Sequence, residues 1–126
     1  PPPVQVPPPA GQYLQGLPAS SGVVEGRARV LAPGTVDLDE VRVGEVLVAR
    51  TTDVGLSPLF LVSAAVVTEM GGPLSHAAVV AREYGVPAVV NVVGATMAIR
   101  TGDLLRVDGD RGTVEILNEH AKPSAS

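Results

Sequence analysis

Residues 64–92 hold two apolar segments that flank a glycine pair and a helix, and this succession constrains the fold more than any other feature. Ala64–Thr68 and Ala88–Val92 are short and rich in valine and alanine, as buried strands of parallel sheets are. Between them lie Gly71-Gly72 and a helix that begins at His76. Two parallel strands joined through a helix form a right-handed crossover. We therefore predict an α/β fold, or α+β layers, in which strands pack against helices.

Residues with strong positional preferences mark the two ends of this helix. Ser75 is a favoured N-cap, Gly85 suits the left-handed position after a helix, and Pro87 prevents continuation. The alanines of the helix give it a small-residue face that can lie close on a sheet. A second, shorter helix is predicted with Ser57 as its N-cap and Pro58 as its first helical residue.

The rest of the chain divides into strands, turns and two polar or proline-rich ends. Strands are predicted over 23–32, 45–50, 103–108 and 112–117, the last two as a closing hairpin. Residues 1–12 are expected to be a proline-rich linker, either a tether or a disordered end, and both alternatives stay open. Residues 13–118 form the expected globular domain, and residues 119–126 form a polar tail.

Charge and composition exclude several functions. The net charge is −4 without a basic patch, so nucleic acid and anionic membranes are poor partners. Cysteine is absent, which excludes disulfides and thiolate chemistry, and no apolar stretch reaches membrane-spanning length, so a cytoplasmic protein is expected. The single lysine, Lys122, lies in the tail, and no phosphate-loop lysine motif occurs. We therefore expect no nucleotide site, cofactor or metal within this domain.

His76 is the residue whose position most directly indicates chemistry. It stands at the start of a helix, where unpaired backbone N–H groups and the helix dipole favour an anion. An imidazole placed there can attack a phosphoryl group and leave the resulting oxygens facing those donors. The alternative is that Gly71-Gly72 is only a tight turn and His76 a surface residue. The residues alone leave these two interpretations about equal.

Several segments together resemble a known family. They are the run from Gly71 to Val90, with its Gly-Gly-x-x-Ser-His-Ala-Ala core, and the segments 19–28, 52–53, 57–60, 107–109 and 112–114. These segments resemble the PEP-utilising enzyme mobile domain. It is the swivelling phosphohistidine domain of phosphoenolpyruvate synthase, pyruvate phosphate dikinase and rifampicin phosphotransferase. The resemblance spans roughly residues 16–117 and implies a layered β/β/α fold.

The resemblance also implies roles for individual residues. His76 would be phosphorylated, and Gly71, Gly72 and Ser75 would shape the phosphate pocket. Thr68 or Thr52 could offer it a hydroxyl, although ordinary strand-end hydrogen bonding is favoured for both. Arg50 and Arg82 could neutralise phosphate, but the helical position of Arg82 favours an ion pair in solvent. His120 is expected to be inert.

Two positions depart from the family pattern. Leu74 replaces the threonine of members switched by a regulatory kinase, which argues against that regulation and favours the rifampicin phosphotransferase-like branch. Asn91 stands where glycine is common, which puts the turn there in question.

The resemblance implies partners as well. A separate ATP-grasp domain would use ATP and Mg²⁺ to phosphorylate His76, and an acceptor domain would pass the group to pyruvate, a PEP-related compound or another small molecule such as a rifamycin. The rival interpretation is a non-catalytic binding or regulatory module that keeps the fold.

Overall fold

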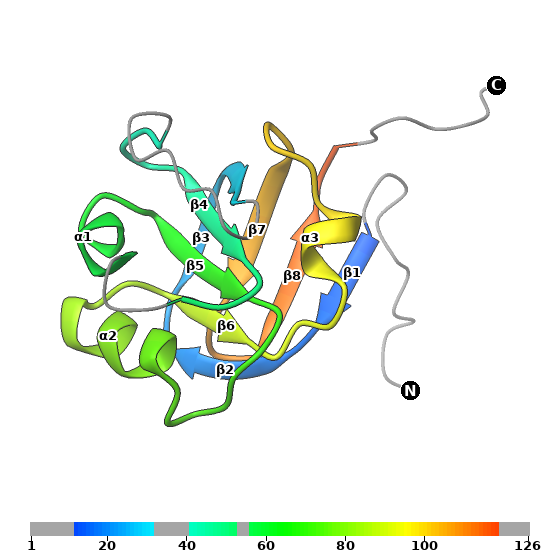
Figure 1. The fold of residues 1–126 in the computed structure, drawn as a ribbon. Helices are drawn as coiled ribbons and strands as arrows, with labels where there is room; N and C mark the ends of the chain where they lie inside the picture. Colours follow the sequence, from blue (N-terminus) through cyan, green and yellow to red (C-terminus); the bar gives the residue numbers. More distant parts are fainter. Residues whose placement is uncertain (1–11, 32–40, 53–55, 119–126) are drawn as a thin grey trace, which may run out of the picture.

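The computed structural model describes residues 12–31, 41–52 and 56–118, which contain eight strands and three helices (Figure 1). In chain order they are β1 (Gln12–Gln15), β2 (Leu17–Ser20), β3 (Val23–Val30), β4 (Val46–Ala49), α1 (Ser57–Phe60), β5 (Ala65–Thr68), α2 (His76–Tyr84), β6 (Ala88–Val90), α3 (Ala95–Ala98), β7 (Leu104–Asp108) and β8 (Thr113–Ile116). Apart from Gln12, the predicted linker and tail lie outside the described residues. None of the helices in this part of the chain has the length and apolar character needed to cross a membrane.

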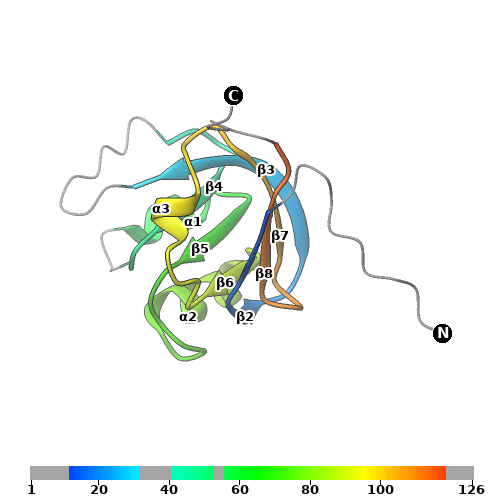
Figure 2. The ribbon, with the colours of Figure 1, turned by 90° about the vertical axis from the view of Figure 1, so that its right-hand side faces the viewer.

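The strands are hydrogen-bonded in the order β1-β8-β7-β3-β4-β5-β6-β2. We call β4, β5 and β6, with β2 antiparallel beside β6, the parallel layer, and β1, β8 and β7 the antiparallel layer. Strand β3 belongs to both layers, because residues 23–27 pair with β7 and residues 28–30 with β4. Figure 2 shows β3 curving from one layer to the other. The continuous sheet therefore folds over on itself.

Two separate hydrophobic cores fill the spaces between the layers. Side chains alternate along a strand, so the parallel layer contributes to both cores. Val46 and Val48 face the antiparallel layer, where they share a core with Leu105. Leu47 and Ala49 face the opposite way, into a core shared with Phe60 of α1 and the alanines of α2. The order sheet, sheet, helices confirms the predicted β/β/α architecture.

The predicted ends of α2 are confirmed. Ser75 Oγ accepts a hydrogen bond from the Ala78 amide, and Gly85 is left-handed with φ 71°. Asn91 also has a positive φ, 59°, so it takes the conformation for which glycine is usually chosen and keeps the turn. The predicted cap of α1 is wrong: Leu56 occupies the cap position, and Ser57 is the first helical residue.

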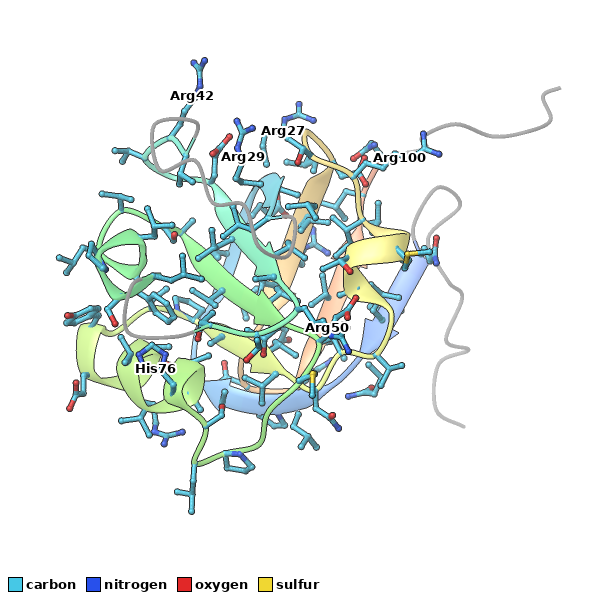
Figure 3. All side chains as sticks on the ribbon, in the orientation of Figure 1. Arg27, Arg29, Arg42, Arg50, His76 and Arg100 are labelled. Carbon is cyan, nitrogen blue, oxygen red and sulfur yellow. The ribbon has the colours of Figure 1, made fainter. Side chains whose placement is uncertain are left out.

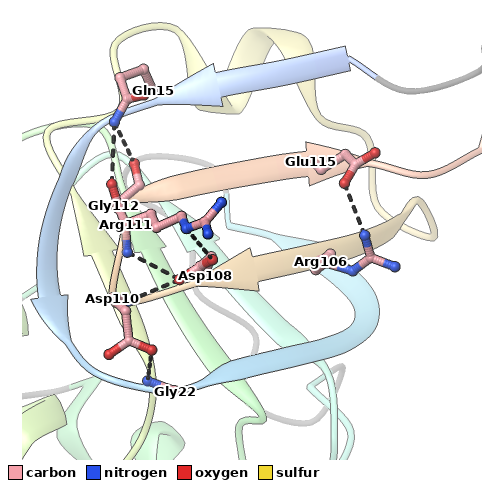
Figure 4. A network of polar contacts seen from close by, with 8 residues as sticks. All are labelled: Gln15, Gly22, Arg106, Asp108, Asp110, Arg111, Gly112 and Glu115. Atoms are coloured by element: carbon pink, nitrogen blue, oxygen red, sulfur yellow. Dashed lines mark hydrogen bonds and ion pairs between the residues drawn. The ribbon is translucent and has the colours of Figure 1, made fainter. Parts of the chain in front are cut away.

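The hairpin of β7 and β8 is confirmed, and polar contacts bind its turn to neighbouring strands (Figure 4). Asp108 Oδ1 accepts from the amides of Asp110 and Arg111, both at 3.0 Å. Gln15 Nε2 at the end of β1 donates to the Gly112 carbonyl over 3.1 Å. The Gln15 contact lies at the end of the antiparallel pairing of β1 with β8, an arrangement that the local sequence did not predict.

Candidate functional site

His76 is half-buried at the start of α2, and its ring lies between two hydroxyl groups. Nδ1 is 3.0 Å from Oγ1 of Thr52, which follows β4, and Nε2 is 3.2 Å from Oγ of Ser57 at the start of α1. Figure 3 shows His76 on α2. The ring is directed toward neighbouring elements. Three segments that are separate in sequence therefore meet at one imidazole.

The two contacts define the chemistry available to the ring. A neutral imidazole donates from one nitrogen and accepts at the other, and a hydroxyl can serve either role. When Nδ1–H donates to Thr52, the Ser57 hydroxyl donates to the lone pair on Nε2. In the other tautomer the roles are exchanged. Either way one nitrogen carries a lone pair that can act as a nucleophile.

An aromatic contact limits the orientation of the ring further. The rings of Phe60 and His76 have centroids 6.2 Å apart and an interplanar angle of 81°, an edge-to-face arrangement. Phe60 is fully buried in the core beneath the helices, so it provides a fixed surface for the imidazole. The ring is thus held by two polar contacts and one apolar contact.

The two glycines of the turn before His76 differ in backbone conformation and in the space around them. Gly71 has φ 118°, and a Cβ there would lie 3.0 Å from Ser75 Oγ. Gly72 has ordinary φ, and a Cβ there would meet no atom within 4 Å. Ser75 closes the turn by donating from Oγ to the Gly72 carbonyl over 2.7 Å. Gly71 is therefore required by the backbone, whereas Gly72 leaves open space beside the helix start.

The first turn of α2 supplies backbone donors next to the imidazole. The Ala78 amide donates to Ser75 Oγ over 3.4 Å, and the Val79 amide donates to the Ser75 carbonyl over 3.0 Å. The amides of His76 and Ala77 have no acceptor among the residues that the structure describes. The site thus combines an imidazole, two hydroxyls and the positive end of a helix dipole.

Of the two threonines considered from the sequence, only Thr52 contacts His76. Thr68 is fully buried at the end of β5, and its hydroxyl donates to the Met70 carbonyl over 2.9 Å. Phosphate oxygens need donors, and this proton is already engaged, so the geometry favours the strand-end role for Thr68. Ser57 was missed as a site residue because its position next to proline indicated a helix cap.

The arginines do not surround His76. Arg82 donates to the carbonyls of Ala19 and Pro73 over 2.9 and 2.8 Å, so the predicted ion pair in solvent is wrong. Arg50 is exposed after β4 and lies apart from His76 in Figure 3. The other labelled arginines, Arg27, Arg29, Arg42 and Arg100, lie along the far edge of the molecule (Figure 3). His120 lies outside the described residues.

Comparisons with known proteins identify the family of this chain. The sequence profile of the family described as PEP-utilising enzyme, mobile domain, matches residues 41–112, a stretch that includes Thr52, Ser57 and Phe60 as well as His76. A solved structure of Enzyme I is 32% identical with a TM-score of 0.55, over 63% of this chain and 33% of that one.

Two similar proteins carry transferase names. The chain is 51% identical over 107 residues to a rifampicin phosphotransferase of Streptomyces sviceus, covering 83% of the chain and 12% of the relative. It is 48% identical over 107 residues to the prodigiosin synthesizing transferase PigC of Serratia marcescens, covering 85% of the chain and 12% of the relative. The chain thus spans about an eighth of the length of these proteins. Because the family profile matches more than half of its residues, the chain belongs to the mobile-domain family of PEP-utilising enzymes.

Proposed function

We propose that this chain is the phosphoryl-carrier domain of an ATP-dependent phosphotransferase and that His76 carries the phosphoryl group. The observation on which the proposal rests is the position of the imidazole, at the first residue of α2 with a hydroxyl against each ring nitrogen. Family membership and the phosphotransferase names of relatives support the same function.

The attacking nitrogen is proposed to be Nε2. The contact of Nδ1 with Thr52 is the shorter of the two, and Nδ1 lies beside the carbon that joins the ring to the main chain. The hydrogen bond from Nδ1–H to Thr52 then keeps the proton on Nδ1. The hydrogen bond from the Ser57 hydroxyl to Nε2 breaks, which frees the Nε2 lone pair for attack. A bond forms between Nε2 and phosphorus as the bond from phosphorus to the donor oxygen breaks. The ring proton stays on Nδ1 until the group is passed on.

The product of this step is an anion beside the start of a helix. The first amides of α2 would donate to the phosphoryl oxygens, and Gly72, where an added Cβ would meet no atom within 4 Å, leaves room in the turn before the helix. The intermediate divides one transfer into two, which is the advantage of covalent catalysis. Gly71 and Ser75 then serve the pocket indirectly, because they hold the turn and the first helical turn in place.

The partner domains would belong to the same longer chain or to a separate chain, and relatives of which this chain covers 12% have the length to hold further domains. An ATP-grasp domain would transfer the β-phosphoryl group of ATP to His76, with Mg²⁺ at that site, and an acceptor domain would take the group from it. The acceptor would be pyruvate, a PEP-related compound or another small molecule such as a rifamycin. Residues 13–118 would be the moving domain and the ends its linkers. The chain alone should not bind ATP.

Labelling of the histidine tests this proposal. The chain is incubated with its ATP-grasp partner and ATP labelled in the β-phosphoryl group, and the labelled residue is mapped. An acid-labile, base-stable label on His76 is expected. Absence of label with a partner that is active on another carrier domain would instead indicate a binding or regulatory module. The same experiment with His76→Ala serves as the control.

A further inference from the structure

Arg82 joins two backbone segments that are far apart in the sequence. It lies in the last turn of α2, where Nη1 donates to the Ala19 carbonyl of β2 over 2.9 Å. Nη2 donates to the Pro73 carbonyl, in the turn before the helix, over 2.8 Å. The side chain thus runs back along its own helix toward the turn that precedes His76.

The acceptor on β2 is available because the strand is irregular there. Pro18 pairs with Val89 and Ser20 pairs with Ala88, so the register shifts at Ala19 and leaves it without a partner in the ladder. Such a bulge redirects backbone groups that would otherwise bond along the sheet. Ala19 is buried, and its carbonyl receives the guanidinium of Arg82 instead.

The acceptor in the turn is next to the groups that form the proposed phosphate pocket. Pro73 follows Gly72, whose carbonyl accepts from both the amide and the hydroxyl of Ser75. Ser75 in turn accepts from the Ala78 amide. A displacement of Pro73 would therefore also displace Gly72 and, through the hydrogen bonds of Ser75, the first turn of α2.

We infer that Arg82 is a positioning residue for the phosphoryl group on His76, an inference that rests on the proposed function. Its planar fork serves two carbonyls on different elements at the same time, and so holds the turn at a fixed distance from β2. Lysine has one ammonium group on a flexible stem and cannot hold both carbonyls in the same way. Arg82 acts through backbone position, not through contact with phosphate.

Phosphoramidate tests the inference on the 126-residue chain without an ATP-grasp partner. It phosphorylates imidazole directly: the phosphorus–nitrogen bond of the reagent breaks, ammonia leaves, and phosphorus bonds to the ring. The rate of His76 labelling and the half-life of phosphohistidine are measured for wild type, Arg82→Met and Arg82→Lys. Arg27→Met is the matched control, because Arg27 Nη1 also donates to a backbone carbonyl, that of Gly102, at the far edge of the molecule. Melting temperatures are recorded for all four chains.

The expected result is a drop in labelling rate and phosphohistidine half-life of about tenfold in Arg82→Met and a smaller drop in Arg82→Lys, with Arg27→Met unchanged. Arg82→Lys retains the charge and most of the stem, so it remains informative if Arg82→Met folds poorly. Equal rates and half-lives in the Arg82 variants and the control would overturn the inference and leave the proposed function intact. A wild-type chain that is not labelled at His76 would overturn both.

Discussion

The hydroxyl of Ser57 lies 3.2 Å from Nε2 of His76, so the first residue of α1 contacts the first residue of α2. The proposed nucleophile is therefore hydrogen-bonded in the resting domain. Attack on phosphorus requires this hydroxyl to move aside, and afterwards it is close enough to donate to a phosphoryl oxygen. Thr52, on the other nitrogen, has no such need to move.

This difference predicts unequal effects of removing the two hydroxyls. Thr52→Val should lower the rate of His76 labelling about tenfold, because Nδ1 loses the acceptor that keeps its proton there. Ser57→Ala should have a smaller effect, since the lost hydrogen bond has to break during the reaction. Labelling rates by phosphoramidate and the ¹⁵N shifts of the His76 ring would measure both changes.

Thr52→Ser is the matched control, because it keeps the hydroxyl and should restore the wild-type tautomer. If Ser57→Ala were the more damaging change and left Nε2 protonated, the attacking nitrogen would be Nδ1.

Replacement of His76 itself should remove phosphoryl transfer and leave the fold intact. His76→Ala loses two hydrogen bonds to half-buried hydroxyls and the edge contact with Phe60, so a cost of about 2 kcal/mol in unfolding free energy is expected. Denaturant melts and acid-labile labelling would report the two effects separately. Turnover retained by this variant in the full-length protein would exclude His76 as the carrier.

Glu45, which lies away from His76, should make the stability of the fold depend on pH in the acid range. Burial raises the pKa of its carboxyl. The hydrogen bonds from Arg29 and the Arg42 amide, together with the positive charges of the two arginines, lower the pKa by more than burial raises it. The net pKa therefore lies below its ordinary value of 4.5. A lowered pKa in the folded state stabilises the protein above the unfolded value. That stabilisation is lost as the pH falls through the lowered folded value.

Urea melts of wild type and Glu45→Gln from about pH 6 to about pH 3 would test this. Wild type should be the more stable at the upper end, and the difference should shrink toward the lower end. A difference that stayed constant with pH would show that the carboxylate charge contributes nothing.

Local sequence was sufficient for features that depend on neighbouring residues. The ends of α2 could be predicted because Ser75 and Gly85 have preferences that act within one helical turn. The parallel strands could be predicted because both of their faces are buried and apolar. The β/β/α order came from the family resemblance, since no local pattern records that β3 crosses between layers.

The contacts of His76 could not be predicted in the same way. Thr52 and Ser57 reach the imidazole because β4 and β5 are neighbours in the sheet, which brings Thr52 after β4 and Ser57 of α1 to the start of α2. The contacts of Arg82 depend on a bulge in β2, a strand that pairs with β6 across a long stretch of sequence. Such relationships arise from tertiary pairing, which residue preferences do not encode.

The glycines around α2 should separate folding from chemistry. Gly71→Ala forces a side chain into positive φ and against Ser75, so it should lower both stability and labelling. Gly85→Ala adds a similar backbone strain of about 1 kcal/mol at φ 71°, where the new Cβ meets no atom within 4 Å, and should lower stability alone.

Gly72→Val places a side chain in open space at ordinary φ, so the melting temperature should change little while labelling of His76 falls strongly. Melting curves and labelling rates for the three variants provide the comparison. Labelling at the wild-type rate in Gly72→Val would mean that the phosphoryl group does not occupy the space beside this glycine.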